Sequence, residues 1–256
     1  MNDTEQQSPV QAHDILAAFS LLTRLPIPVD HELAGQRAAE ATWAYPLVGA
    51  ALGFGVGIIG LLLGWIGTPP GIAAAVLLAA FAFLTGAMHE DGLADCADGF
   101  GGAAEPAQRL ELMKDSRIGA FGAIALVIVL VARWNGLEAL QSGWLPFLLM
   151  AVAAASRVPM VLAMYFMDRA RKTGLSASVG RPPAVSVALA LIIGLVACLA
   201  GAGLAGGLIF FWALLGAVPV LFLARRLIDG QTGDVLGASQ QCAEVAALAA
   251  AVAMFG

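Results

Sequence analysis

The chain has 256 residues, of which 60% are hydrophobic and only 12% charged, and its formal net charge is −5. A mean hydropathy of +0.85 is too high for an ordinary soluble domain. The negative charge argues against a nucleic-acid partner, and Cys96, Cys198 and Cys242 are spaced too widely to form a metal motif or to predict a disulfide.

A short apolar segment, residues 13–25, comes first in the chain. It follows a polar, acidic stretch that has no basic n-region, so no cleavable signal peptide is expected. The segment is too short to span a membrane and prolines end it, which favours an interfacial helix. Arg24 lies at its end, where it either anchors the helix at the membrane surface or binds an anionic substrate.

Several later apolar runs of about 18 or more residues are long enough to cross a bilayer core of ~30 Å as helices. Only helices and closed barrels can span a membrane, and these runs do not alternate with period 2. The sequence therefore predicts an all-α, polytopic membrane bundle in which residues 1–256 form a single integral membrane domain. About seven transmembrane helices are expected, near residues 43–66, 72–88, 118–134, 144–167, 183–204, 208–225 and 235–255.

The most unusual segment is residues 89–102, which holds four acids within nine residues of an acid-poor chain. If this segment is helical, Asp91, Asp95 and Asp98 project within an arc of about 60°, whereas Glu90 points away from that face. Carboxylates held together repel one another unless a cation lies between them, and hard oxygen ligands suit Mg²⁺. A solvated acidic turn is the alternative, but the scarcity of acids elsewhere favours a metal site.

Residues 89–117 as a whole are expected to form an acidic, Gly-rich loop that contains a short helix beginning near Pro106. Lys114 and Arg117 are three residues apart and share a face in this loop. Two cations beside acids and glycines suit a diphosphate bridged by a metal. The same cations could equally serve to set the membrane topology.

The basic residues predict the orientation. Of the 13 Lys and Arg residues, 11 fall in the N-terminal segment and in the loops 89–117, 168–182 and 225–234, which lie on one side of a seven-helix path. By the positive-inside rule this side is cytoplasmic, so the acidic loop would face the cytoplasm from a multi-pass protein of the inner membrane. The basic residues 169–172 could also meet anionic lipid.

Two charges are expected inside the membrane. Arg157 lies well within a predicted span, where a charge costs about 2.5–3.5 kcal/mol on insertion scales, so it needs an acidic or phosphate partner. Glu244 lies in the last predicted span, so for the same reason it needs a charged partner. Just before that span, Asp234 belongs to a second acidic turn and is either an N-cap or part of the site.

Four segments together resemble the cobalamin synthase family, the membrane enzymes also called adenosylcobinamide-GDP ribazoletransferases. They occur in the order found in that family and extend over nearly the whole chain. Of the four, the segments at 89–102 and 113–122 are the most specific for the family. The segments read LTRLPIP at 22–28, HEDGLADCADGFGG at 89–102, MKDSRIGAFG at 113–122 and GDVLGA at 233–238.

The resemblance implies that adenosylcobinamide-GDP is joined to α-ribazole or its 5′-phosphate, with release of GMP and with Mg²⁺ as cofactor. A ribose hydroxyl would attack the diphosphate phosphorus that bears the corrinoid, so positioning and electrostatics would supply most of the catalysis. The expected metal ligands are Glu90, Asp91, Asp95 and Asp98, and one of these carboxylates would accept the hydroxyl proton. The expected substrate-binding residues are Arg24, Lys114, Arg117, Arg157 and Asp234, and Asp234 should lie within roughly 10–12 Å of the acidic cluster.

Three other classes of membrane protein fit the pattern less well. A CDP-alcohol phosphotransferase uses spaced aspartates too, but its pattern has an arginine where this chain has Asp95. A membrane prenyltransferase would have two longer Asp-rich motifs on facing helices. A cation-coupled transporter would place its acids near the midplane on broken helices, whereas this cluster is expected at the membrane edge.

Overall fold

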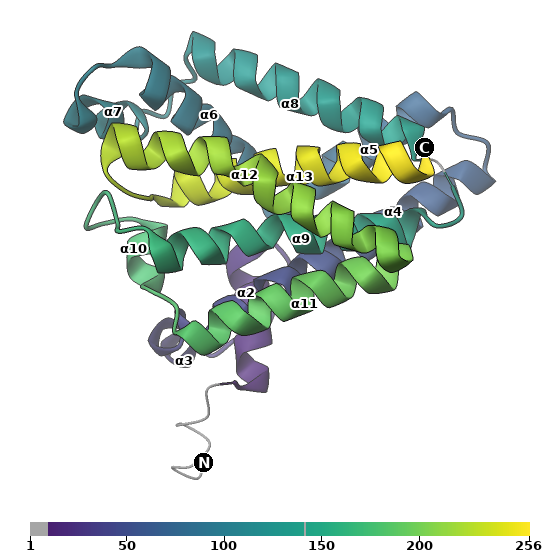
Figure 1. The fold of residues 1–256 in the computed structure, drawn as a ribbon, viewed down its shortest axis with the longest axis horizontal. Helices are drawn as coiled ribbons and strands as arrows, with labels where there is room; N and C mark the ends of the chain where they lie inside the picture. Colours follow the sequence, from purple (N-terminus) through teal and green to yellow (C-terminus); the bar gives the residue numbers. More distant parts are fainter. Residues whose placement is uncertain (1–9, 141) are drawn as a thin grey trace.

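The computed structural model describes residues 10–140 and 142–256, and this part of the chain is helical with short connections (Figure 1). The described residues contain no strand, and a single isolated bridge pairs Arg169 with Gln231. The predicted all-α bundle is confirmed. Its elements are α2 (Ala12–Leu22), α3 (His31–Gln36), η1 (Glu40–Ala44), α4 (Tyr45–Trp65), α5 (Pro70–Thr85), α6 (Met88–Gly102), α7 (Pro106–Leu112), α8 (Ala120–Ala139), α9 (Leu145–Phe166), α10 (Leu175–Val179), α11 (Ala184–Ala202), η2 (Gly203–Ala205), α12 (Gly206–Ile228) and α13 (Gly233–Phe255).

Five helical stretches of the described chain are long and apolar enough to cross a membrane, and a sixth is added if α5 and α6 count as one span bent by 89°. One of the five, residues 184–228, consists of two helices, α11 and α12. The chain turns back between them. The turn brings Gly206 so close to Cys198 that an added Cβ would collide with the Cys198 carbonyl. Every apolar segment predicted as a span is thus a helix, although α5, with 16 residues, reaches spanning length only together with α6.

Helix α9 lies at the centre of the bundle, where it contacts α4, α11, α12 and α13 (Figure 1). In the 18-residue apolar stretch of α9, 83% is buried inside the protein, whereas in the corresponding stretch of α8, at the edge, 22% is buried. Gly49, Gly53 and Gly57 of α4 face α9, and a Cβ at any of them would collide with the α9 backbone. Such a row of small residues lets two membrane helices approach closely.

Helix α2 is tied to the start of α4 through a buried acid. The Asp14 carboxylate accepts hydrogen bonds from the Arg37 guanidinium at 2.8 Å and from the Trp43 indole at 3.0 Å. Burial raises the pKa of Asp14, but these hydrogen bonds outweigh it and hold the pKa below its usual value. Helix α2 ends at Leu22, three residues before the predicted end, and with 11 residues it is too short to span.

The prediction of a loop over residues 89–117 was wrong, because most of this segment forms α6 and α7. Helix α6 is stabilised by packing against α13 and α8. Glycines that suggested a loop instead lie at close contacts, as Gly92 does against Asp234 and Gly99 against Met113. The short helix beginning at Pro106 is confirmed as α7.

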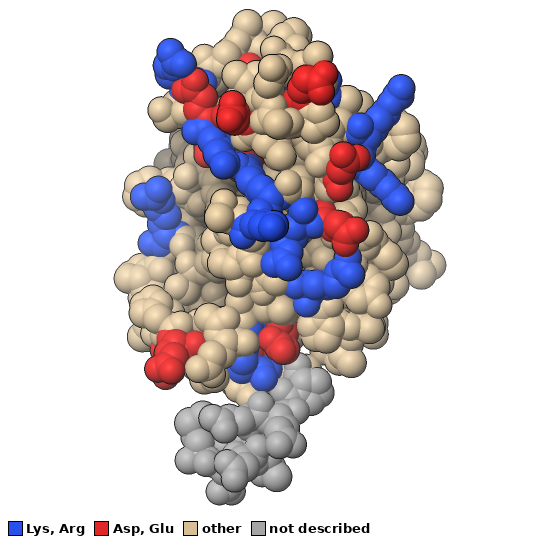
Figure 2. Space-filling view, turned by 90° about the vertical axis from the view of Figure 1, so that its left-hand side faces the viewer, with Lys and Arg blue, Asp and Glu red and all other residues tan. Residues whose placement is uncertain are grey.

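Helices α7 and α10 and the connection between α12 and α13 lie at one end of the bundle (Figure 1). Figure 2 looks onto this end and shows Lys and Arg side chains across its middle with acids between and around them. The loops that the positive-inside argument placed on one side therefore do share one end of the molecule.

Candidate active site

The close crossing of α6 and α13 brings the two acidic segments together. Gly92 of α6 lies against the backbone of Asp234, where an added Cβ would be 2.7 Å from the carbonyl oxygen. Gly237, three residues further along α13, lies against His89, where an added Cβ would be 3.1 Å from the Cα atom. Asp234 is therefore a close neighbour of Asp91, as the sequence analysis expected of a site residue.

A cavity of about 200 Å³ lies beside this crossing. The charged residues that line it are the acids Asp91 and Asp234 and the arginines Arg169 and Arg171. Apolar side chains form much of the rest of the wall, as is usual for a small-molecule site with a few convergent polar groups. They include Leu21, Leu22, Tyr45, Met160, Met164 and Leu236.

Backbone pairing fixes the two arginines of the cavity. The amide N–H of Gln231 donates to the carbonyl of Asp168 at 2.8 Å, and the N–H of Ala170 donates to the carbonyl of Gln231 at 2.9 Å. This pairing holds the segment after α9 against the segment before α13. Sequence reasoning gave residues 169–172 a role with lipid, since nothing in their spacing shows that they pair with a segment about 60 residues away.

Asp234 is not the N-cap of α13. The Thr232 hydroxyl caps the helix by accepting a hydrogen bond from the N–H of Val235 at 3.3 Å. The Asp234 carboxylate instead forms an ion pair with Arg171 and accepts a hydrogen bond from the Thr232 hydroxyl at 3.2 Å. The Asp234 carboxylate thus lies between Arg171, which lines the cavity, and the hydroxyl of Thr232, which caps the helix.

Asp95 lies close enough to Asp91, Asp98, Asp234 and Arg171 to interact electrostatically with all four. The acids of α6 and α13 therefore form one charged region, which we call the acidic region and define as Asp91, Asp95 and Asp234. Across residues 10–140 and 142–256, however, no three His, Cys, Asp or Glu side chains are arranged in a group that could by itself hold a metal ion.

Asp98, two turns along α6 from Asp91, faces a different helix. Its carboxylate accepts hydrogen bonds from the backbone N–H groups of Gly119, at 2.7 Å, and Gly122, at 2.9 Å. These groups belong to the start of α8, whose N–H groups have no partners within the helix. Asp98 thus holds the start of α8 against α6.

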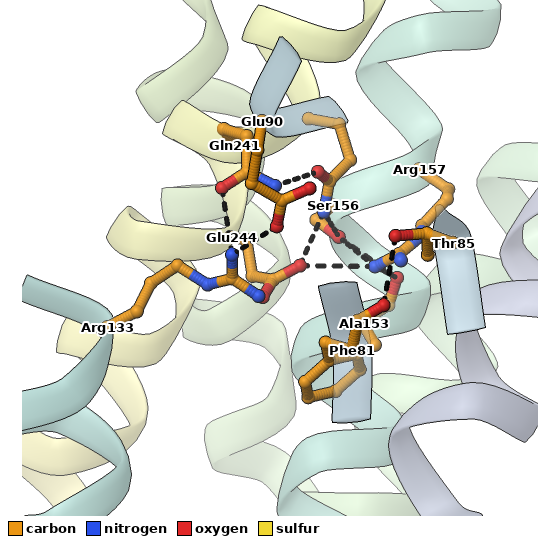
Figure 3. Close-up of polar contacts among 10 residues, drawn as sticks. Phe81, Thr85, Glu90, Arg133, Ala153, Ser156, Arg157, Gln241 and Glu244 are labelled. Carbon is orange, nitrogen blue, oxygen red and sulfur yellow. Dashed lines mark hydrogen bonds and ion pairs between the residues drawn. The ribbon is translucent and has the colours of Figure 1, made fainter. Parts of the chain in front are cut away.

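Glu90 and Arg157 belong to a buried network inside the bundle (Figure 3). The Arg133 guanidinium pairs with Glu90 at 2.7 Å and with Glu244 at 2.7 Å, and Arg157 pairs with Glu244 at 3.2 Å. Two arginines and two glutamates balance in charge. The expectation that Arg157 and Glu244 need charged partners is confirmed, and neither residue lines the cavity described above.

The other predicted basic residues lie away from the cavity. Arg24 packs over Gly86 at the bend between α5 and α6. The Arg117 side chain is 86% exposed and pairs with Asp115 at 2.7 Å, and this hydrogen-bonded guanidinium lowers the pKa of Asp115 to about 2. Lys114 lies in the same turn after α7. The structure therefore joins Asp91, Asp95 and Asp234 with Arg171, not with the basic pair that follows α7.

Residues 14–252 match the model of the family described as cobalamin-5-phosphate synthase. A relative from Bradyrhizobium diazoefficiens is 41% identical over 94% of this chain and 93% of its own length, and one from Azorhizobium caulinodans is 41% identical over 92% and 93%. One from Mesorhizobium japonicum is 40% identical over 92% of this chain and 91% of its own length. All three are named adenosylcobinamide-GDP ribazoletransferase. No solved structure matches the chain.

Proposed function

This chain belongs to the cobalamin-5-phosphate synthase family, and we propose that it joins adenosylcobinamide-GDP to α-ribazole, or to α-ribazole 5′-phosphate, with release of GMP. The observation that carries the proposal is the cavity at the α6–α13 crossing, where carboxylates and guanidinium groups surround one space. Transfer of a phosphoryl group depends mainly on positioning and on charge stabilisation, which such a site supplies. The phosphotransferase, prenyltransferase and transporter alternatives have no comparable support, because the matching relatives cover nearly the whole chain.

We propose Mg²⁺ as the cofactor, held by the acidic region. Asp91 and Asp234 face the cavity, and Asp95 lies within electrostatic range of both. Mg²⁺ is usually bound by one or two carboxylates together with substrate phosphates, so a complete protein cage is not required. When bound, the ion would neutralise charge that develops on the phosphoryl oxygens. Glu90 and Asp98 already have partners of their own and would support the ligands rather than bind the ion.

Within this site, Asp91 is the carboxylate best placed to accept the proton of the attacking hydroxyl, because it is exposed and lines the cavity. The apolar wall suits the aromatic base of α-ribazole, which would gain from burial. The cavity would accommodate the reacting groups of the two substrates, and the bulky corrinoid would remain at its mouth.

We further propose that the charged end of the bundle faces the cytoplasm from the inner membrane. The basic residues at this end support this orientation, because cytoplasmic loops carry an excess of Lys and Arg. Nucleotide substrates would then reach the cavity from the compartment in which they are made.

Turnover by the purified protein tests the function. The protein in lipid nanodiscs, supplied with adenosylcobinamide-GDP, α-ribazole and Mg²⁺, should release GMP in proportion to the corrinoid product. Omitting α-ribazole or adding a chelator should stop the release. Release of GMP without α-ribazole would show a hydrolase instead, and release of CMP from a CDP-alcohol would favour the rival phosphotransferase.

A further inference from the structure

We propose that Arg171 binds the diphosphate of the nucleotide substrate and that it competes with the metal for Asp234. The identity of the substrate rests on the proposed function, whereas the anion site follows from the position of Arg171 alone. The proposal moves the diphosphate from Lys114 and Arg117, where the sequence pattern placed it, to the segment between α9 and α10.

Arg171 is more buried than two other paired cations at the charged end, Arg181 and Arg117. Its side chain is 16% exposed, against 56% for Arg181 and 86% for Arg117. An ionic contact shielded from water is stronger than one at an open surface. A guanidinium also matches carboxylate and phosphate oxygens with a rigid fork of donors, so Arg171 is suited to bind either group.

The other cations of this segment have different roles. The Arg169 guanidinium donates a hydrogen bond to the carbonyl of Ala177 at 3.1 Å, which ties α10 to the cavity wall. Arg181 pairs with Asp168 at 2.9 Å on the surface. Because Asp168 and Ala170 are both paired with Gln231, the backbone on either side of Arg169 is fixed, and Arg171 projects from a rigid support.

The charges around Arg171 explain why a cation is needed there. Asp91, Asp95 and Asp234 would repel a diphosphate that approaches the cavity. Arg171 is the guanidinium paired with this acidic region, through the carboxylate of Asp234. With Asp234 engaged by a divalent ion, the Arg171 guanidinium would lose that partner and would be available to a phosphate oxygen.

This exchange predicts effects of opposite sign when Arg171 is replaced by Gln. The divalent ion should bind more tightly, because a competing cation has been removed from Asp234. A diphosphate should bind more weakly, because its donor has been lost. A residue that only supported the fold would weaken both interactions when it was replaced.

The experiment compares wild type, Arg171→Gln and Lys172→Gln, all full-length and in nanodiscs of zwitterionic lipid. Lys172→Gln is the matched control, since it removes the same charge from the next residue, which is exposed and does not line the α6–α13 cavity. Binding of Mn²⁺ is measured by electron paramagnetic resonance, and binding of inorganic pyrophosphate by calorimetry at saturating Mg²⁺. For Arg171→Gln we expect a several-fold lower Kd for Mn²⁺ and a roughly 10–100-fold higher Kd for pyrophosphate. The control should match wild type.

Weaker binding of both ligands to Arg171→Gln, or unchanged binding of pyrophosphate, would overturn the proposal. Anionic lipid provides a second arm, because a headgroup phosphate has the same chemistry. If nanodiscs containing phosphatidylglycerol abolish pyrophosphate binding to wild type, the arginine belongs to lipid, and equal affinity in both lipids assigns it to the soluble diphosphate. None of these readouts needs turnover, so a failure of GMP release and a failure of this proposal are distinguishable.

Discussion

Single substitutions can test whether the two acids that line the cavity, Asp91 and Asp234, take part in catalysis. We expect Asp91→Asn and Asp234→Asn each to lower kcat about 100-fold or more, because each removes a charge from the acidic region and keeps the side-chain shape. GMP release at saturating Mg²⁺ measures the effect. Glu105→Gln, at an exposed position before α7, should retain activity. Activity above half of wild type in both aspartate variants would exclude a shared site.

Asp98 should behave differently from its neighbours on α6. Replacing it with Asn removes a charged acceptor from the start of α8, so we expect a loss of about 1–2 kcal/mol of stability. A lower Tm should accompany an unchanged Mg²⁺ concentration for half-maximal activity. If instead activity is lost at an unchanged Tm, Asp98 is a metal ligand, as its spacing in the sequence predicts.

Helical spacing predicts that Asp91, Asp95 and Asp98 share a face, and the segment is indeed helical. Spacing cannot predict that Asp91 and Asp98, two turns or about 10 Å apart along α6, lie against two different neighbouring helices. Asp98 meets backbone groups 21 and 24 residues away, and the Arg171–Asp234 pair joins residues 63 apart. Such partners depend on the packing of the whole bundle, so the sequence shows which acids matter but not what each one contacts.

At the scale of helices, the α6–α13 crossing depends on the absence of a side chain at Gly92. We expect Gly92→Ala to cost about 1–3 kcal/mol and to reduce GMP release, because the new Cβ would press on the Asp234 backbone and separate the two helices. Thermal unfolding and activity should be measured together. The two acids would move apart even in molecules that remain folded.

Gly55→Ala on α4 is the matched control, because a Cβ at Gly55 would meet no atom of another helix within 4 Å. Alanine favours a helix over glycine by about 1 kcal/mol, so this variant should be as stable as wild type or more so. Equal behaviour of the two alanine variants would show that the crossing does not need the close approach.

Long apolar helices were predictable because a bilayer leaves the backbone no other way to satisfy its hydrogen bonds. Helices α3 and α10, with six and five residues, were missed because so short a segment has no hydrophobic period. The prediction of a loop over residues 89–117 was wrong for a related reason. Glycine lowers helix propensity wherever it occurs, and only tertiary packing shows that Gly92 and Gly99 are needed for contact.

For the whole molecule, labelling with an impermeant thiol reagent tests the orientation. Single cysteines would replace Glu105, directly before α7, Lys172, between α9 and α10, and Ser142, between α8 and α9. The α8–α9 connection lies at the end of the bundle opposite α7 and α10 (Figure 1). In intact cells the reagent should label only the Ser142 position, and permeabilisation should expose all three. The native cysteines should first be replaced by alanine. Labelling at Glu105 but not at Ser142 in intact cells would reverse the orientation.

The buried network of arginines and glutamates also constrains how the protein enters a membrane. Helices leave the ribosome in order, so α9 arrives with Arg157 long before Glu244, which follows it by 87 residues. Arg133 meets Glu90 from an earlier helix, but Glu244, the acid that forms an ion pair with Arg157, is made only with α13. The central helix of the bundle would therefore carry a charge that is costly in lipid until the last helix of the described chain is made. The ion pairs of Glu244 with Arg133 and Arg157 would therefore form only when α13 enters the bundle.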